Sequence, residues 1–140
     1  MTPDHAMMAV AERLALFLER GEPSLLDGLF AQGDVTIVEN FPPHVFSGQD
    51  GVRSWAMLMQ RRVEHIVQLR HVFGRPQDFS RSESGVYFSL PTRWSGMQDG
   101  HSFTELGAWG FLLVEQDGGW RIRAYSWGLV SFADRQGGDQ

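Results

Sequence analysis

Cysteine and lysine are both absent from this chain of 140 residues. Without cysteine there is no disulfide, thiolate nucleophile, iron–sulfur cluster or cysteine zinc site. Without lysine, Schiff-base and lysine-base chemistry are excluded as well. All 12 basic residues are arginine, against 17 acidic residues, and only Arg61 and Arg62 are adjacent. With a net charge of −5, the chain lacks the positive patch of a nucleic-acid binding protein.

Long apolar runs are also missing. No window approaches the roughly 20 apolar residues that cross a bilayer, and the first residues lack the positive region of a secretion signal. We therefore expect a cytoplasmic protein with no membrane contact. The sequence contains no glycine-rich phosphate loop or dinucleotide fingerprint, and its five histidines lack the spacing of metal ligands. We accordingly expect no cofactor and no metal.

Three helices are predicted in the first half of the chain. The first begins at Thr2-Pro3-Asp4 and ends at Gly21, and a short second one follows Glu22. The third is long and starts near Asp50, after a β-branched strand over 34–40. Apolar residues at three- and four-residue steps mark the buried side of the two longer helices. These residues are Met7, Val10, Ala11, Leu14, Phe17 and Leu18 in the first, and Val52, Trp55, Met59, Val63 and Ile66 in the third.

Strands dominate the second half. Turn-forming residues separate predicted strands over 69–79, 84–94, 100–115 and 119–131. Helices in front of consecutive long strands predict an α+β fold, in which a curved antiparallel sheet wraps on the N-terminal helices and the long helix. We expect one domain over 1–140, a disordered polar tail at 134–140, and an apolar pocket inside the bent sheet.

Three segments carry a resemblance to a known superfamily. They are Asp34-Val35 at a strand start, Ser47-Gly48-Gln49-Asp50 before the long helix, and Gly118-Gly119-Trp120-Arg121-Ile122 at the last hairpin. In this order they resemble the nuclear transport factor 2-like superfamily, with its SnoaL-like and ketosteroid isomerase-like members, over about residues 5 to 132. The resemblance implies a cone-shaped barrel with a pocket for a small, largely apolar organic molecule. It also implies a homodimer that forms through the sheet.

Glu39 is the first candidate catalytic residue. It follows Asp34 by five residues and precedes Gly48 by nine, and both spacings resemble those of the general-base Asp of ketosteroid isomerases. A carboxylate at the mouth of an apolar pocket has a raised pKa, which makes it a useful base near neutrality. The alternative is a strand-end Glu in water. The oxyanion-binding Tyr and Asp of those isomerases would fall on Leu14 and near Gly110, so a true ketosteroid isomerase is not expected.

His71 is the second candidate. Leu69-Arg70-His71-Val72-Phe73-Gly74 resembles the strand that carries the catalytic His of scytalone dehydratase and related dehydrochlorinases. The resemblance implies a carboxylate partner two residues before Gly21, where this chain has Glu19 instead of Asp. A carboxylate-oriented imidazole can act as a general base in an elimination. The alternative is a structural His in a plain salt bridge with Glu19.

Aromatic residues and one Met supply the candidate pocket wall, although such residues also form ordinary core. The candidates are Trp55, Met59, Phe73, Tyr125 and Trp127. Odd-numbered residues of the strand 100–115 share one face with His101 and Glu105, and the comparison with ketosteroid isomerases places this face outward. We therefore expect four of its apolar residues at the dimer interface. These are Phe103, Trp109, Phe111 and Leu113.

The leading functional hypothesis is a cofactor-independent lyase or isomerase that removes a proton from a small organic molecule in an enclosed pocket. Glu39 or His71 would be the base, with Glu19 orienting the His. A non-catalytic small-molecule binding protein on the same fold is a second hypothesis. A dimerisation module with a filled core is a third.

Overall fold

The computed structural model describes residues 1–136, in which two α-helices pack against one sheet of seven strands. The helices are α1 (His5–Arg20) and α2 (Gly48–Val63), with a 3-10 turn at Pro23–Leu26. The short strands are β1 (Thr36–Val38), β2 (Val45–Ser47), β3 (Val67–Phe73) and β4 (Gln77–Ser82). The long strands are β5 (Gly85–Gln98), β6 (His101–Gln116) and β7 (Gly119–Gln136). The predicted α+β class is confirmed.

The ends of α1 follow directly from the sequence. The side chain of Asp4 accepts a hydrogen bond of 2.9 Å from the backbone N–H of Met7, so it caps the first turn. Gly21 ends the helix with a φ of 69°, a left-handed conformation that glycine adopts without strain. Helix α2 starts at Gly48, so Asp50 lies within its first turn and does not precede the helix as predicted. The helix expected after Glu22 is only one 3-10 turn.

The strand predicted over 69–79 is in fact two strands. Residues 74–76 separate them: Gly74 still donates its N–H to the Pro91 carbonyl of β5, but Pro76 has no N–H to give to the ladder. The sheet order is β2-β1-β7-β6-β5-β3, with β4 also paired to β5. The sheet is open and mixed rather than wholly antiparallel, because β1 runs parallel to β7.

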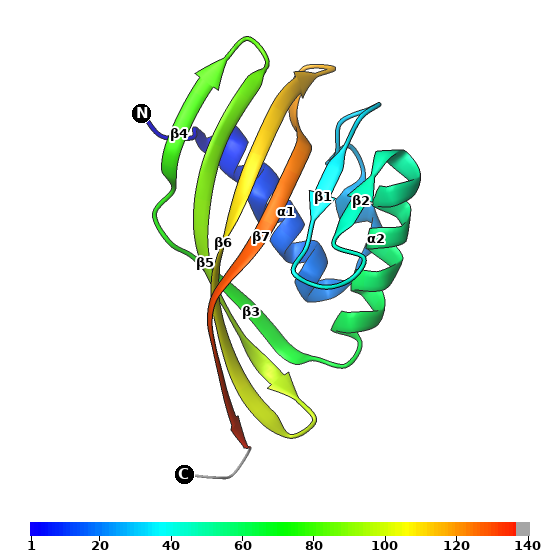
Figure 1. The fold of residues 1–140 in the computed structure, drawn as a ribbon, viewed down its shortest axis with the longest axis vertical. Coiled ribbons are helices and arrows are strands. Elements are labelled where there is room, and N and C mark those ends of the chain that lie inside the picture. The colour runs from blue at the N-terminus through cyan, green and yellow to red at the C-terminus, as the bar shows by residue number, and fades with distance from the viewer. Residues whose placement is uncertain (137–140) are drawn as a thin grey trace.

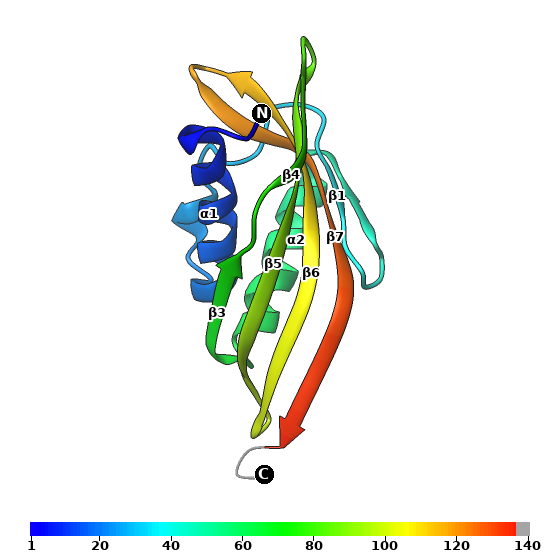
Figure 2. The ribbon, with the colours of Figure 1, turned by 90° about the vertical axis from the view of Figure 1, so that its left-hand side faces the viewer.

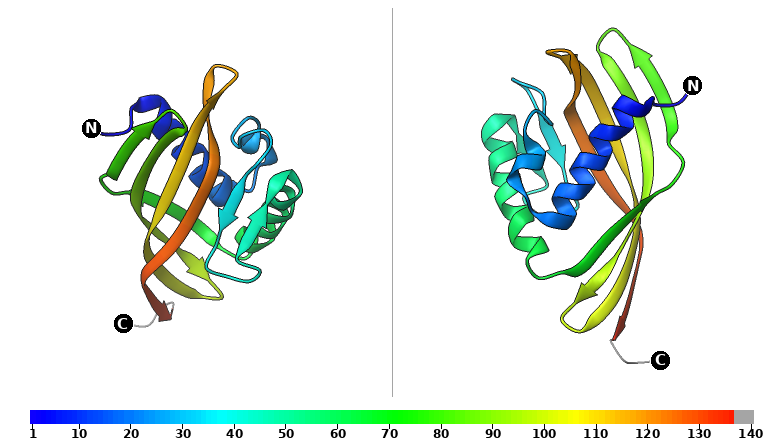
Figure 3. Two further views of the ribbon diagram at one scale, coloured as in Figure 1. Left: turned by 45° about the horizontal axis from the view of Figure 1, so that its top comes forward. Right: turned by 180° about the vertical axis from the view of Figure 1, so that it is seen from behind.

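The bent sheet forms the wall on which the helices rest. Figure 1 shows α1 crossing one face of the sheet, while α2 lies beside the β1–β2 hairpin at its edge. Seen from the side, β5, β6 and β7 curve and extend past the helices at one end (Figure 2). The view from behind in Figure 3 places α1 against the inner face of the sheet. Irregular pairing between β6 and β7 near Leu106 and Leu112 accompanies this curvature.

The inner face of β6 is the face that we expected to point outward. Phe103, Trp109, Phe111 and Leu113 are all buried within the hydrophobic core of the single chain. Gly110 lies on the other face, where an added Cβ would meet the hydroxyl of Tyr87 at 2.8 Å. Because side chains alternate along a strand, an error of one position inverts the whole face. The predicted dimer interface on these four residues is therefore wrong.

Among the described residues, no helix is long and apolar enough to cross a membrane. Strand β7 continues to Gln136, which pairs with His101. The remaining part of the predicted disordered tail, 137–140, lies outside the described residues.

Candidate functional site

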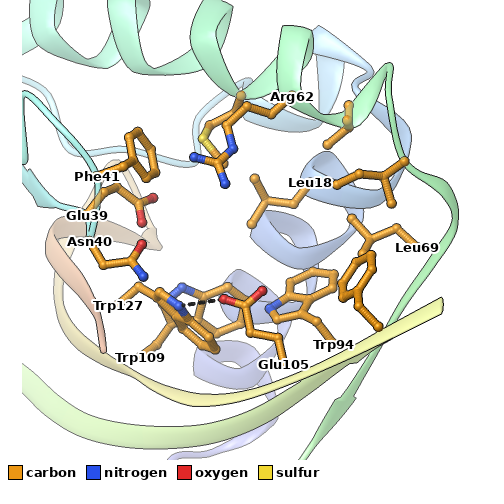
Figure 4. A pocket seen from close by; sticks show the side chains of 14 residues that line it. Leu18, Glu39, Asn40, Phe41, Arg62, Leu69, Trp94, Glu105, Trp109 and Trp127 are labelled. Atoms are coloured by element: carbon orange, nitrogen blue, oxygen red, sulfur yellow. Dashed lines mark hydrogen bonds between the residues drawn. The ribbon is translucent and has the colours of Figure 1, made fainter. Parts of the chain in front are cut away.

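A cavity of about 100 Å³ lies between α2, the loop after β1 and the inner face of the sheet. Its walls are mainly aromatic and aliphatic, and four polar side chains interrupt them (Figure 4). The polar residues are Glu39, Asn40, Arg62 and Glu105. The apolar residues are Leu18, Phe41, Met59, Val63, Ile66, Leu69, Trp94, Phe103, Trp109 and Trp127.

Glu39 is fixed by two buried donors. Its Oε2 accepts a hydrogen bond of 3.0 Å from Trp55 Nε1 and one of 2.5 Å from the Tyr125 hydroxyl. The parallel pairing of Ile37 with Tyr125 brings these side chains together. Burial raises the pKa of Glu39 above its ordinary value of 4.5, although the two hydrogen bonds and the charge of Arg62 oppose that rise. The residue is only 6% exposed, and its carboxylate points toward the cavity (Figure 4).

Glu105 faces the same cavity from β6. Its Oε2 accepts a hydrogen bond of 3.3 Å from Trp127 Nε1, shown as the dashed line in Figure 4. Burial raises the pKa of Glu105 as well, against the lowering effects of Trp127 and Arg62. The cavity thus holds two desolvated carboxyl groups on different walls. Groups of this kind can accept and donate protons near neutral pH.

Arg62 is the one cationic side chain that lines the described cavity. It comes from the last turn of α2, and its guanidinium carbon lies 4.4 Å from the ring centroid of Phe41. This cation–π contact holds the guanidinium at the mouth of the cavity. Figure 4 shows it pointing inward from the α2 side, above the two carboxylates.

His71 and Glu19 form a close pair outside the cavity lining. His71 Nδ1 lies 2.5 Å from Glu19 Oε2, and the backbone N–H of His71 donates to the same oxygen at 2.8 Å. The other ring nitrogen, Nε2, lies 2.9 Å from Glu12 Oε1. Because both ring nitrogens face carboxylates of α1, the imidazole joins α1 to β3. The Trp94 ring lies against His71 at a centroid distance of 5.5 Å, and it is Trp94 that lines the cavity.

The structure brings only part of the predicted site together. Glu39, Met59 and Trp127 line the cavity, whereas His71 and Glu19 do not. The other three predicted wall residues lie outside its lining. Trp55 and Tyr125 are buried behind Glu39, and Phe73 packs against His71 and Trp109.

Sequence reasoning missed Arg62 and Glu105. Arg62 follows Met59 by three positions, so it shares the side of α2 that Met59 presents to the cavity. Glu105 lies on the inner face of β6 together with Phe103 and Trp109, because residues at every second position share one face of a strand. Arg62 was readable from the helical period, and Glu105 from the strand period once the correct face of β6 was chosen.

No group of three or more His, Asp and Glu side chains that could hold a metal ion occurs within residues 1–136. The polar groups of the cavity are two carboxyls, one amide and one guanidinium. This set suits proton transfer and the binding of a small polar group within an apolar ligand.

Comparison with known proteins identifies the fold through structure and not through sequence. No protein-family model matches the sequence, and no curated protein matches it significantly. A crystal structure of a hexachlorocyclohexane dehydrochlorinase (LinA type 2) superposes with a TM-score of 0.78 at 12% identity, covering 96% of this chain and 90% of that one.

Two further structures support the same fold. A proposed scytalone dehydratase from Novosphingobium aromaticivorans gives a TM-score of 0.75 at 13% identity, with 96% of this chain and 92% of that chain covered. A nuclear transport factor 2-like superfamily protein from Salmonella enterica gives 0.70 at 12% identity, with 88% and 87% covered. The chain therefore has the fold of the nuclear transport factor 2-like superfamily. At these identities the likeness concerns the fold alone.

Proposed function

We propose that this chain, which has the nuclear transport factor 2-like fold, is a cofactor-independent enzyme of the lyase or isomerase type. Its substrate is a small, largely apolar organic molecule that binds in the cavity between α2 and the sheet. Glu39 is the base that removes a proton from a carbon atom of this molecule. Two of the similar structures carry names of elimination enzymes, a dehydrochlorinase and a dehydratase, which supports this class of reaction.

The geometry of Glu39 is the observation that carries the proposal. Trp55 and Tyr125 both donate to Oε2, which leaves Oε1 without a donor among the described residues. The two donors hold the carboxylate in one orientation, and burial favours its taking up a proton. A fixed, desolvated carboxylate with one free oxygen beside an apolar cavity is suited to proton abstraction.

His71 has a different role in this proposal. Both of its ring nitrogens are engaged by Glu19 and Glu12, and it does not line the cavity. We assign it and Glu19 to holding α1 against β3, where their contact positions the wall behind Trp94.

Deuterium exchange into small carbon acids tests the proposal. Cyclohex-2-enone and nitroethane are incubated in D2O with the protein, and loss of the acidic C–H signal is followed by NMR. We expect the wild type to exceed the buffer rate for at least one probe, and Glu39→Gln to return to that rate. Glu64→Gln, on the exposed surface after α2, is the matched control and retains the wild-type rate.

The other outcomes separate the alternative hypotheses. Binding of the probes without exchange, followed by tryptophan quenching, would support a non-catalytic binding protein. No binding and no exchange would support a dimerisation module. Exchange that survives in Glu39→Gln would contradict the role of Glu39.

A homodimer through the sheet is also part of this proposal. The outer face carries exposed apolar side chains on three neighbouring strands, namely Val72, Tyr87 and Leu106. Sedimentation at micromolar concentration tests the assembly, and a monomer would contradict it. The cytoplasmic location stays a prediction from the sequence.

A further inference from the structure

We infer that Arg62 binds the negative charge that develops on the ligand, and that the ligand carries an oxygen acceptor such as a carbonyl group. The part of this inference that concerns the reaction rests on the proposed function. The part that concerns binding does not, because an anion subsite at Arg62 can be measured without any turnover.

The position of Arg62 is the first argument. Its guanidinium points into the cavity from α2 (Figure 4), and its contact with the face of the Phe41 ring limits its movement. No carboxylate oxygen of the described residues lies within 4.0 Å of it in an ion pair. Its N–H groups are therefore available to a ligand, and a guanidinium forms strong charge-assisted hydrogen bonds to an oxyanion.

The other donors around the cavity are already engaged or uncharged. Trp55, Tyr125 and Trp127 give their N–H or O–H groups to the two carboxylates. The Trp94 ring lines the cavity, and its indole N–H donates to none of the described side chains that line it. This N–H is not among the buried atoms that lack a partner, so it is accessible and can donate to an acceptor on the ligand. Arg62 supplies the charge, and Trp94 can add a neutral donor.

The positions that hold oxyanion donors in ketosteroid isomerases cannot serve here. Leu14 is fully buried in the core of α1, and Gly110 lies on the outer face of the sheet. Proton removal from a neutral carbonyl compound nonetheless leaves negative charge on the ligand. Arg62 is the cationic group next to that charge, and it belongs to a different element, α2.

The charges balance in the proposed step. The C–H bond of the ligand breaks, an O–H bond forms on Glu39, and the electron pair moves onto the carbonyl oxygen. Glu39 becomes neutral while the ligand becomes an anion, so the negative charge moves within reach of Arg62. Glu105 would repel this anion if ionised, and the burial that raises its pKa reduces the repulsion.

The size of the cavity limits the ligand to a compact molecule. A closed apolar cavity of about 150 Å³ accepts benzene. This cavity measures about 100 Å³ and is partly open, so part of a ligand would lie in its mouth. Trp94, Trp109 and Trp127 offer flat surfaces to a ring. The class that fits is a single-ring or short-chain carbonyl compound with an acidic C–H bond.

Anion binding tests the subsite directly. The probes are 4-nitrophenol, which ionises near neutrality and whose anion has its own absorbance, and nitrobenzene as its neutral counterpart. Quenching of the cavity tryptophans gives the dissociation constants for the wild type, Arg62→Gln, Arg62→Lys and Arg61→Gln. Arg61 and Arg62 are adjacent and both exposed, but only Arg62 lines the cavity, so Arg61 is the matched control.

We expect the wild type to bind 4-nitrophenolate more tightly than nitrobenzene. Arg62→Gln should weaken phenolate binding about threefold to fivefold, the upper part of the range for an ion pair that is open to water. The affinity of Arg62→Gln for nitrobenzene should stay within about twofold of the wild-type affinity, which is less than the loss of one hydrogen bond would cause. Arg62→Lys should retain part of the preference, and Arg61→Gln all of it. Glu39→Gln should bind the phenolate more tightly, because it removes a like charge.

Three results would overturn the inference: equal wild-type affinity for both probes, no phenolate binding, or equal losses in Arg62→Gln and Arg61→Gln. The outcome is separable from that of the proposed function. Arg62-dependent phenolate binding without deuterium exchange would refute the enzyme and keep the anion subsite. Exchange that is lost in Glu39→Gln but unchanged in Arg62→Gln would keep the enzyme and refute the role of Arg62.

Discussion

Replacing Tyr125 with phenylalanine tests the hydrogen bond that fixes the proposed base. The change removes one hydroxyl, which donates to Glu39 Oε2 from a fully desolvated position. The ring remains, so its contacts with Trp55 and Phe111 are preserved. The variant therefore isolates one hydrogen bond without opening a cavity larger than one oxygen atom.

The loss of unfolding free energy in Tyr125→Phe should depend on pH. A hydrogen bond to a charged group contributes about 1.5–3 kcal/mol, and one between neutral groups about 0.5–1.5 kcal/mol. Loss of the bond removes an interaction that lowers the pKa of Glu39, so the pKa rises further in the variant. A carboxyl with a raised folded-state pKa destabilises the fold as pH increases from the unfolded value through the folded one. The variant should therefore lose more stability at pH 8 than at pH 4.

Chemical denaturation at both pH values measures the difference. At pH 8, we expect a loss of about 2 kcal/mol, or a melting temperature lower by about 8 °C for a chain of this size. Tyr87→Phe is the matched control, because Tyr87 is the other tyrosine and lies 43% exposed on the outer face. Equal losses at pH 4 and pH 8, or equal losses in the two variants, would refute the Tyr125–Glu39 bond as described.

Two further substitutions test the surroundings of the cavity. His71→Asn should cost about 2 kcal/mol in denaturation, because the half-buried carboxylate of Glu19 loses its contact with the imidazole and keeps only the backbone N–H of residue 71. It should leave deuterium exchange unchanged, and loss of exchange in folded His71→Asn would return His71 to the catalytic site. His65→Asn, an exposed control, should change neither stability nor exchange. Gly107→Ala should cost about 1–3 kcal/mol through overpacking, because the added Cβ would collide with the carbonyl of Gly128 and with the Trp127 ring. Gly128→Ala meets nothing within 4 Å and should be nearly neutral in the same melting experiment, so equal costs would contradict this account of the packing.

The two long helices and the order of the elements along the chain were predictable because their signals are local. Asp4, the apolar spacing and Gly21 together define α1, and the structure places the helix between those caps. The break between β3 and β4 was missed, although Gly74 and Pro76 mark it. Local patterns therefore identify elements better than they identify the gaps inside them.

The site was less predictable because it depends on contacts between distant segments. The bond between Tyr125 and Glu39 joins residues 86 positions apart, and it requires the parallel pairing of β1 with β7. No local pattern specifies that pairing. Arg62 was not among the predicted site residues, because an arginine at a helix end usually points to solvent, yet its long side chain can reach inward.

The inner face of β6 shows how a comparison can override a physical signal. Aromatic and aliphatic residues at alternate positions from Phe103 to Leu113 indicate the buried face by themselves. Counting back from the last hairpin placed Gly110 inward instead and reversed the assignment. The correct face would have revealed Glu105 as well.

The pH dependence of deuterium exchange tests the central claim most directly. In the wild type, the exchange rate of the best carbon-acid probe should rise with pH as Glu39 ionises, with a midpoint above 4.5, and then level off. Glu39→Gln should show only the buffer rate at every pH. A wild-type rate no greater than that of folded Glu39→Gln, or a midpoint at the ordinary carboxyl value, would contradict Glu39 as a desolvated base.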